Sequence, residues 1–377
     1  MRRHIKYRLP DSREKGGWGF LWLLLLLLAA AVAWIFWPSA KTAGPQLKQK
    51  NIPGLAALPA PQPANLPSVK VPAPAPRVVT GTNVPPTAPT PAARPVQNVF
   101  EAQLALARQS ISPGSIDGAI GLQTRAALRA FQQRENLPAS GELDEATRAR
   151  LTLDVPSYVN YTVTTNDLLR LRPLGTSWLA KSQQDRLDYE TILELVAERA
   201  QSHPNLIRRL NPNVNWINLP SGATVQIPNV EKLSARIKAA LVRIHLAGKT
   251  LQVFDNHTNL LAHFPCSIAR SVEKRPVGEL HVLDAAENPN YTFDPDNFPE
   301  SPEARQLGRK LVLPAGPNNP VGTAWISLDK PGYGIHGTPR PEEVGRTESH
   351  GCFRLANWNA EYLVKLVSIG TPVFIEP

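Results

Sequence analysis

The first long apolar segment of the chain runs from Trp18 to Trp37. Its twenty residues contain no charge, and at 1.5 Å per residue a helix of that length crosses a hydrocarbon core of about 30 Å. The preceding segment 1–17 carries six Lys/Arg and two Asp/Glu, so the positive-inside rule places it in the cytoplasm as a tail and the rest of the chain outside. We therefore expect a single-pass transmembrane anchor over 18–37. A cleaved signal peptide is the alternative.

Residues 38–96 show no apolar periodicity. They contain fifteen prolines and no Asp or Glu. Such a composition cannot bury enough apolar surface to fold, and it favours extended polyproline II. We expect a proline-rich linker that carries the following domains away from the bilayer.

Helical periodicity marks the segment 97–153 as a small all-α domain. We expect a first helix over 101–110 and a second helix with Thr124 as its N-cap. Asp144 begins a third element, which reaches Leu151.

The segment 154–232 has the pattern of a small α+β unit. Residues 189–200 (YETILELVAERA) form an amphipathic stretch, and 205–228 contain another helical stretch, a turn and a short strand pattern.

From Ala240 the apolar period changes to two. The stretches LVRIHL, TLQVF and LLAHF are separated by turn residues, which is typical of consecutive antiparallel hairpins. One later helix is expected over 360–369, closed by Gly370. The sequence thus predicts a multidomain protein in which a β-rich domain over 240–377 follows the two smaller units behind one transmembrane helix.

The net charge of +10 is unevenly distributed. The tail contributes +4, residues 38–99 contribute +6, residues 100–239 contribute +2 and residues 240–377 contribute −2. Because the excess lies outside the predicted domains, a folded basic groove for nucleic acid is not expected. The two cysteines, Cys266 and Cys352, exclude a disulfide-rich scaffold and a four-cysteine metal site.

The candidate chemistry lies in GIHGTPRPEEVGRTESHGCFRLAN, residues 334–357. A cysteine attacks as the thiolate, so a catalytic Cys352 needs a nearby base, and His336 precedes it by sixteen residues. Gly351 would allow close approach of the backbone, and adjacent amide N–H groups could hold an oxyanion.

Other interpretations of these residues compete with a nucleophile. A lone cysteine in a β domain is often a small buried hydrophobe, which is what we expect for Cys266 in its apolar surroundings. The side chains of His336, His350 and Cys352 could also supply three zinc ligands, but no carboxylate or second cysteine is placed to complete the set. We expect no metal and no cofactor.

Two segments resemble known wall-binding modules. Residues 97–153 contain IDG, GxxT, AFQ and GELD in the order found in the three-helix peptidoglycan-binding domain. Residues 154–232 loosely resemble a LysM-type module through LNPN and LPSGATVQIP, with a packing spacer as the alternative.

The block His-Gly-Thr followed by Ser-His-Gly-Cys-Phe-Arg-Leu resembles the signature of L,D-transpeptidases with the YkuD-like catalytic domain. RPVGELHV, PAGPNNPVGTAWISL and YGIHG extend the resemblance over 240–377. The family implies a β-rich fold and a thiol acyltransferase that acts on peptidoglycan stem peptides. Two positions depart from its usual pattern, namely Ala269 in place of Gly and Arg275 in place of Thr.

The resemblance also implies the site residues. Cys352 would be the nucleophile, His336 the general base, and the carbonyl oxygen of Gly337 the acceptor that orients the imidazole. Arg354 would bind a substrate carboxylate or anchor the loop. The remaining candidates for the substrate and oxyanion pocket are Ser349, His350 and Gly351.

The sequence therefore predicts a membrane-anchored enzyme of the cytoplasmic membrane whose catalytic domain lies in the periplasm or cell wall. Its expected partners are peptidoglycan stem peptides, glycan and the inner membrane. A catalytically silent peptidoglycan-binding tether and an L,D-carboxypeptidase that uses water are the alternatives. A zinc D,D-carboxypeptidase would need a His/Asp zinc pattern, which the sequence lacks.

Overall fold

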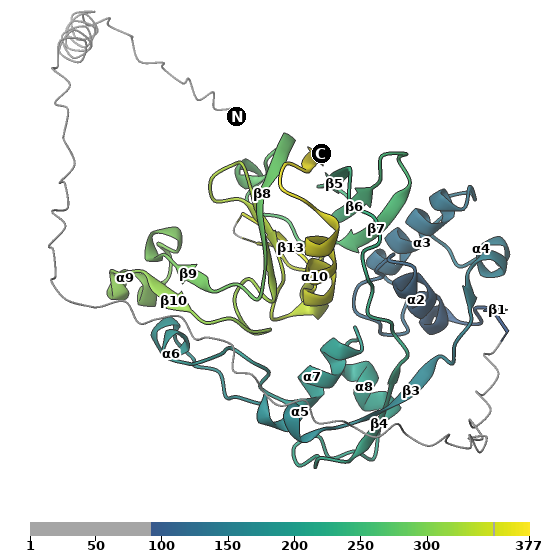
Figure 1. Cartoon of the computed structure of the whole chain (residues 1–377), viewed down its shortest axis with the longest axis horizontal. Helices are drawn as coiled ribbons and strands as arrows, with labels where there is room; N and C mark the ends of the chain where they lie inside the picture. The colour runs from purple at the N-terminus through teal and green to yellow at the C-terminus, as the bar shows by residue number, and fades with distance from the viewer. Residues whose placement is uncertain (1–91, 350) are drawn as a thin grey trace, which may run out of the picture. The chain divides into compact units, whose positions relative to one another are not determined.

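Three helices and a two-stranded sheet form the first domain of the computed structural model, which describes residues 92–349 and 351–377 (Figure 1). Their apolar faces enclose a core that includes Leu104, Leu128 and Phe131. The elements are β1 (Arg94–Pro95), α2 (Val99–Arg108), α3 (Leu122–Arg134), α4 (Glu145–Arg150) and β2 (Thr152–Leu153). The predicted anchor, the tail and all but the end of the linker lie outside the described residues. Within the described part, no helix is long and apolar enough to cross a bilayer.

The starts of the helices in this domain differ from the prediction at two points. The first helix begins at Val99, because the side chain of Asn98 accepts a hydrogen bond from the Glu101 N–H. The prediction of Thr124 as an N-cap is wrong. The helix α3 starts at Leu122 with Gly121 as its N-cap, and the Thr124 hydroxyl is buried, where it accepts from Gln103 Nε2 at 3.0 Å. The Asp144 cap is confirmed.

The linker prediction extended a few residues too far. Arg94 and Pro95 pair with Leu153 and Thr152 as an antiparallel two-stranded sheet. The Arg94 guanidinium also binds the Glu101 carboxylate at 2.6 Å. Backbone pairing and an ion pair thus attach residues 94–95 to the first domain. The proline-rich composition of the linker gave no sign of either contact.

The second, middle domain pairs its first and last strands in an antiparallel sheet. The elements are β3 (Tyr158–Thr162), α5 (Thr165–Leu169), α6 (Trp178–Ser182), α7 (Ile192–Arg199), α8 (Pro204–Leu210) and β4 (Thr224–Pro228). The helix expected over 189–200 is shorter, because Thr191 and Glu194 form a capping box that starts α7 at Ile192. The predicted helix, turn and strand over 205–228 are confirmed in kind.

The third domain is built on an eight-stranded sheet with the order β13-β12-β11-β8-β14-β5-β6-β7. The pairs β12/β13 and β14/β5 are parallel, and the other neighbours are antiparallel. Its strands are β5 (Leu241–His245), β6 (Thr250–Phe254), β7 (Leu260–Pro265), β8 (Gly278–Glu287), β11 (Ala324–Leu328), β12 (Gly334–His336), β13 (Phe353–Arg354) and β14 (Pro372–Glu376). The predicted consecutive hairpins from β5 to β7 are confirmed.

An insertion leaves this sheet between β8 and β11. It contains η2 (Pro295–Asn297), α9 (Pro302–Leu307) and a hairpin of β9 (Tyr291–Phe293) with β10 (Leu311–Leu313). Two further 3₁₀ turns lie in loops, η1 (Val272–Lys274) and η3 (Pro341–Glu343). The helix α9 was not predicted, because its six residues are too few to show a helical period.

The helix α10 (Asn357–Leu366) covers the sheet and shares its core. It was predicted three residues too late. Val367 at its C-cap is already extended, and Gly370, at φ +84°, belongs to the following turn. The first residue of α10, Asn357, is fully buried and donates a hydrogen bond to Glu198 of the middle domain.

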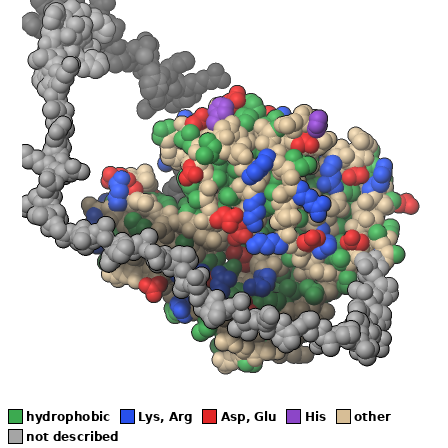
Figure 2. All heavy atoms as spheres, in the orientation of Figure 1, with side chains coloured by type: hydrophobic (Ala, Val, Ile, Leu, Met, Phe, Trp, Pro, Cys, Tyr) green, Lys and Arg blue, Asp and Glu red, His purple; other side chains and the backbone are tan. Residues whose placement is uncertain are grey.

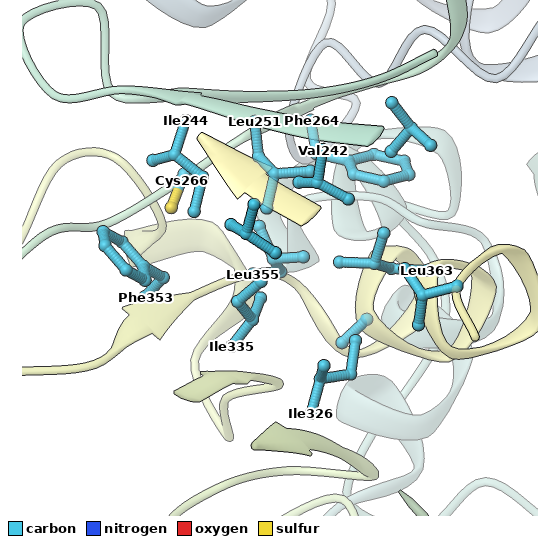
Figure 3. Packing of buried hydrophobic residues seen from close by; sticks show 14 of the residues in the cluster. Val242, Ile244, Leu251, Phe264, Cys266, Ile326, Ile335, Phe353, Leu355 and Leu363 are labelled. Atoms are coloured by element: carbon cyan, nitrogen blue, oxygen red, sulfur yellow. The ribbon is translucent and has the colours of Figure 1, made fainter. Parts of the chain in front are cut away.

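Cys266 lies inside the core of the third domain. Figure 3 shows it beside Ile244 and close to Phe353, and its exposed fraction is 0%. Burial raises the pKa of its thiol to about 12. It is a free thiol in this structure, and the prediction of a small buried hydrophobe is confirmed.

Backbone hydrogen bonds join the three domains into one compact unit. His263 on β7 exchanges backbone hydrogen bonds with Ser110 and Ser112 of the first domain. The Leu187 N–H of the middle domain donates to the Ala315 carbonyl in the third domain at 3.0 Å. On the face that Figure 2 shows, basic and acidic side chains of the described residues are interspersed.

Candidate active site

The strands β12 and β13 pair in parallel, which brings the strand of His336 next to the strand that directly follows Cys352. Its register pairs Ile335 with Phe353 and His336 with Arg354. Side chains alternate along a strand, and Ile335 and Phe353 both point into the core. His336 and Arg354 therefore face the opposite side, and Cys352 lies in the bend directly before β13.

The Cys352 thiol is half-buried and bound to backbone. It donates to the Gly332 carbonyl at 3.5 Å. Burial raises its pKa above the ordinary value, and a hydrogen bond from the Gly334 backbone offsets part of that rise. At neutral pH the sulfur is therefore protonated, so its attack on a carbonyl requires a proton acceptor.

His336 is held as a neutral base. Its Nδ1 donates to the Gly337 carbonyl oxygen at 2.6 Å, which leaves Nε2 unprotonated as the acceptor. The imidazole stacks on Trp325, with ring centroids 5.6 Å apart. Burial is the largest influence on its pKa and lowers it to about 4. The expected His336–Gly337 contact is thus present in the structure.

The loop before Cys352 is bound from several sides. The Ser349 hydroxyl donates to the Cys352 carbonyl at 2.5 Å, and the Ser349 N–H donates to the Ile268 carbonyl at 2.8 Å. Arg354 Nη2 donates to Thr347 Oγ1 and to the Glu348 carbonyl. Of the two roles considered for Arg354, these contacts match a loop anchor.

The other two predicted pocket residues give different results. His350 lies outside the described residues. At Gly351 an added Cβ would meet no atom within 4 Å, and the backbone has no positive φ. No close protein contact requires glycine there, and the space beside it is open to a substrate.

Three residues near the site were not predicted. Trp325 supports the imidazole, and Asn357 packs against Gly337. Tyr291 on β9 lies within electrostatic range of Cys352. Burial raises its pKa to about 12, and the Cys352 thiolate, when it forms, adds to that rise. The strand β9 that carries Tyr291 lies in the insertion, far from the 334–357 motif in sequence, so no local motif could have identified it.

Two family models match the chain. The model of the L,D-transpeptidase catalytic domain matches residues 239–375, and that of the "Putative peptidoglycan binding domain" matches 95–151. The "Putative L,D-transpeptidase YqjB" of Bacillus subtilis (strain 168) is 36% identical over 144 residues, which are 34% of this chain and 73% of that protein. The chain belongs to the L,D-transpeptidase family.

Further relatives carry the same family name. The "Putative L,D-transpeptidase YkuD" of Bacillus licheniformis is 26% identical over 188 residues, which are 49% of this chain and 93% of that protein. The "Probable L,D-transpeptidase YbiS" of Escherichia coli (strain K12) is 30% identical over 185 residues, 48% of this chain and 58% of that protein. A solved L,D-transpeptidase from Mycobacterium smegmatis is 20% identical, with a TM-score of 0.28, over 41% of this chain and 64% of that one.

The matches confirm the resemblance of 97–153 to the peptidoglycan-binding domain and that of 240–377 to the L,D-transpeptidase catalytic domain. The LysM-type resemblance of 154–232 stays a prediction. This L,D-transpeptidase combines a helical peptidoglycan-binding domain with a β-rich catalytic domain. The family supports a transpeptidase whose substrate is peptidoglycan.

Proposed function

We propose that this L,D-transpeptidase transfers a peptidoglycan stem-peptide acyl group through a thioester on Cys352. The observation that carries the proposal is the buried, neutral imidazole of His336, which is bonded to Gly337 and lies on β12, the strand that pairs with β13 directly after Cys352. A protonated thiol beside a neutral imidazole is the pair that general-base attack requires.

The reaction has two acyl-transfer steps. His336 Nε2 takes the thiol proton as Cys352 Sγ attacks the stem carbonyl at residue three, and backbone N–H groups stabilise the oxyanion. The tetrahedral adduct then expels the terminal D-amino acid, whose nitrogen takes the proton from His336. An acceptor amine attacks the thioester, gives its proton to His336, and releases the new amide as the thiol is restored.

We propose the following surroundings for this chemistry. Residues 18–37 anchor the enzyme in the cytoplasmic membrane, and the linker carries the catalytic domain into the periplasm or cell wall. The first domain holds glycan strands near the site, and the middle domain, if it is a LysM-type module, adds a second glycan contact. Protease treatment of spheroplasts should digest the chain after residue 38 and leave the tail protected. Full protection would contradict this orientation.

The test of the chemistry is product analysis. The full chain in detergent is incubated with labelled tetrapeptide muropeptides, and the products and the intact protein are weighed by mass spectrometry. We expect an acyl adduct on Cys352, released D-amino acid and a product joined to the amine. Cys352→Ala should abolish all three without changing the melting temperature.

Two results would replace the proposal. A product trimmed by water alone, with amine acceptors present, would identify an L,D-carboxypeptidase. Glycan binding without any adduct or turnover would identify a silent tether.

A further inference from the structure

The middle domain contacts the backbone that follows the catalytic histidine through two side chains, Glu198 and Asn357. Glu198, on α7, accepts from Asn357 Nδ2 with both carboxyl oxygens, at 3.1 and 3.2 Å. Asn357, the first residue of α10, in turn holds the backbone that follows His336. We propose that Glu198 is a positioning residue for His336, which makes the middle domain part of the catalytic apparatus. This inference rests on the proposed function of His336 as the base.

Asn357 is the central residue of this chain. It is fully buried, and its Oδ1 accepts from the backbone N–H groups of Thr338 at 2.9 Å and of Thr323 at 3.2 Å. Because Oδ1 faces two donors, Nδ2 must face acceptors, which are Glu198 and the Pro317 carbonyl. An unpaired buried amide N–H is costly, so the Glu198 carboxyl, together with the Pro317 carbonyl and the two N–H groups, holds the amide in this orientation.

Steric contact transmits the position of Asn357 to the histidine loop. An added Cβ at Gly337 would lie 2.2 Å from Asn357 Oδ1, and one at Gly322 would lie 2.0 Å from it. The backbone of both glycines therefore packs directly on this oxygen. The Gly337 carbonyl is also the acceptor of His336 Nδ1, so a shift of Asn357 moves the group that orients the imidazole.

The surroundings of Glu198 suit a fixed carboxyl group. The Tyr189 hydroxyl donates to its Oε1 at 3.2 Å. Burial, the main cause, raises its pKa to about 8, with the charges of Glu361 and Glu194 adding to the rise. The group is thus mostly neutral at pH 7, and a glutamine in its place would keep an acceptor oxygen of similar reach.

Three variants of the full chain test the proposal. Glu198→Ala removes the acceptor, Glu198→Gln keeps it, and Asn318→Ala is the matched control. The Asn318 side chain crosses the same domain boundary, but it binds the Asp188 carbonyl and Glu194. Each variant is measured for kcat and KM on a stem tetrapeptide, and for the rate of Cys352 alkylation by iodoacetamide, mapped by peptide mass. The buried Cys266 thiol reports unfolding in the same experiment.

The expected result is a loss in kcat that glutamine restores. For Glu198→Ala we expect kcat and the Cys352 alkylation rate to fall about 10- to 100-fold, the scale of a misplaced catalytic group, with KM within about twofold and Cys266 unreactive. Glu198→Gln and Asn318→Ala should stay within about threefold of wild type. If Glu198→Ala does not fold, Glu198→Asp decides, because its shorter side chain keeps the carboxyl but withdraws it from Asn357.

Unchanged alkylation and kcat in Glu198→Ala would overturn the inference, as would equal losses in Glu198→Gln or in Asn318→Ala. The alkylation assay separates this outcome from failure of the proposed function. If the wild type turns over no muropeptide, but both His336→Ala and Glu198→Ala slow alkylation of Cys352, the positioning role stands and the proposed reaction fails.

Discussion

The Arg275 guanidinium donates a hydrogen bond from Nε to the Ala269 carbonyl oxygen at 2.8 Å. These are the two positions at which the sequence departs from the usual family pattern, and they are in direct contact. Arg275 also donates to the Arg270 carbonyl at 3.1 Å. The Arg270 N–H in turn bonds the Ser349 carbonyl. Arg275 and Ala269, the two residues that depart from the family pattern, therefore hold the 269–275 loop together next to the segment that leads to Cys352.

Arg275→Thr should loosen this loop. Loss of two side-chain hydrogen bonds costs about 1 to 2 kcal/mol, so the melting temperature should fall by a few degrees, and KM for a stem peptide should rise several-fold. The alkylation rate of Cys352 should not change, because Arg275 does not contact His336. Arg275→Lys keeps the positive charge but lacks the planar guanidinium that donates both hydrogen bonds. It should therefore show the same losses as Arg275→Thr. A lysine variant equal to wild type would show that charge alone matters.

In the pH–rate profile of acylation, the fall in rate on the acid side should occur at unusually low pH. Burial lowers the pKa of His336 to about 4, so the imidazole remains a neutral base well below its ordinary value of about 6.5. Acylation rates measured from pH 8 down to 3 should stay level until about pH 5 and then fall as the ring protonates. Trp325→Ala exposes the ring and should move the acid limb upward. A limb near 6.5 in the wild type would contradict this account.

The two histidines of the motif should differ in effect. His336→Ala should lower the acylation rate about 10²- to 10⁴-fold, as expected for a lost general base, with little change in substrate binding. His350→Ala should cost less. Single-turnover rates with both variants check this, and the reverse order would assign the base to His350.

Two glycines of the site should respond oppositely to alanine. Gly337→Ala places a Cβ 2.2 Å from Asn357 Oδ1, and such overpacking costs about 1 to 3 kcal/mol. Its melting temperature should fall by several degrees. Gly351→Ala meets no protein atom within 4 Å, so it should melt like wild type and show an effect only on KM. Thermal melts and steady-state kinetics of both variants test this. A lower melting temperature for Gly351→Ala would show that protein atoms occupy the space beside Gly351.

The true start of the folded part can be tested by truncation. A chain that begins at Gln97 lacks β1 and the Arg94–Glu101 pair, so at pH 7 it should melt on the order of 5 °C below one that begins at Ala92. The Arg94 hydrogen bond, as the main cause, lowers the pKa of Glu101 to about 2. Its stabilisation is full above the ordinary value of 4.5 and disappears as pH falls toward 2. The difference between the two chains should therefore shrink in acid, and a constant difference would exclude the ion pair as its cause.

The sequence alone determined the features that depend on neighbouring residues. Period-two apolar residues are enough to specify the β5 to β7 hairpins, because alternation places one face of each strand in the core. The apolar stretch before Cys266 is likewise sufficient to bury it. The proposed pairing of Cys352 with His336 was predicted from a motif in which the two residues lie sixteen positions apart, and it stays a prediction.

Only the tertiary structure decided what depends on distant segments. Thr124 does not cap its helix, because the helix starts before it and its buried hydroxyl binds Gln103, twenty-one residues away. Arg354 binds the loop, Trp325 stacks on His336 from the neighbouring strand, and Glu198 reaches Asn357 across 159 residues. Contacts of this kind join segments that are distant along the chain, and no local pattern of side chains records which distant segments will pack together.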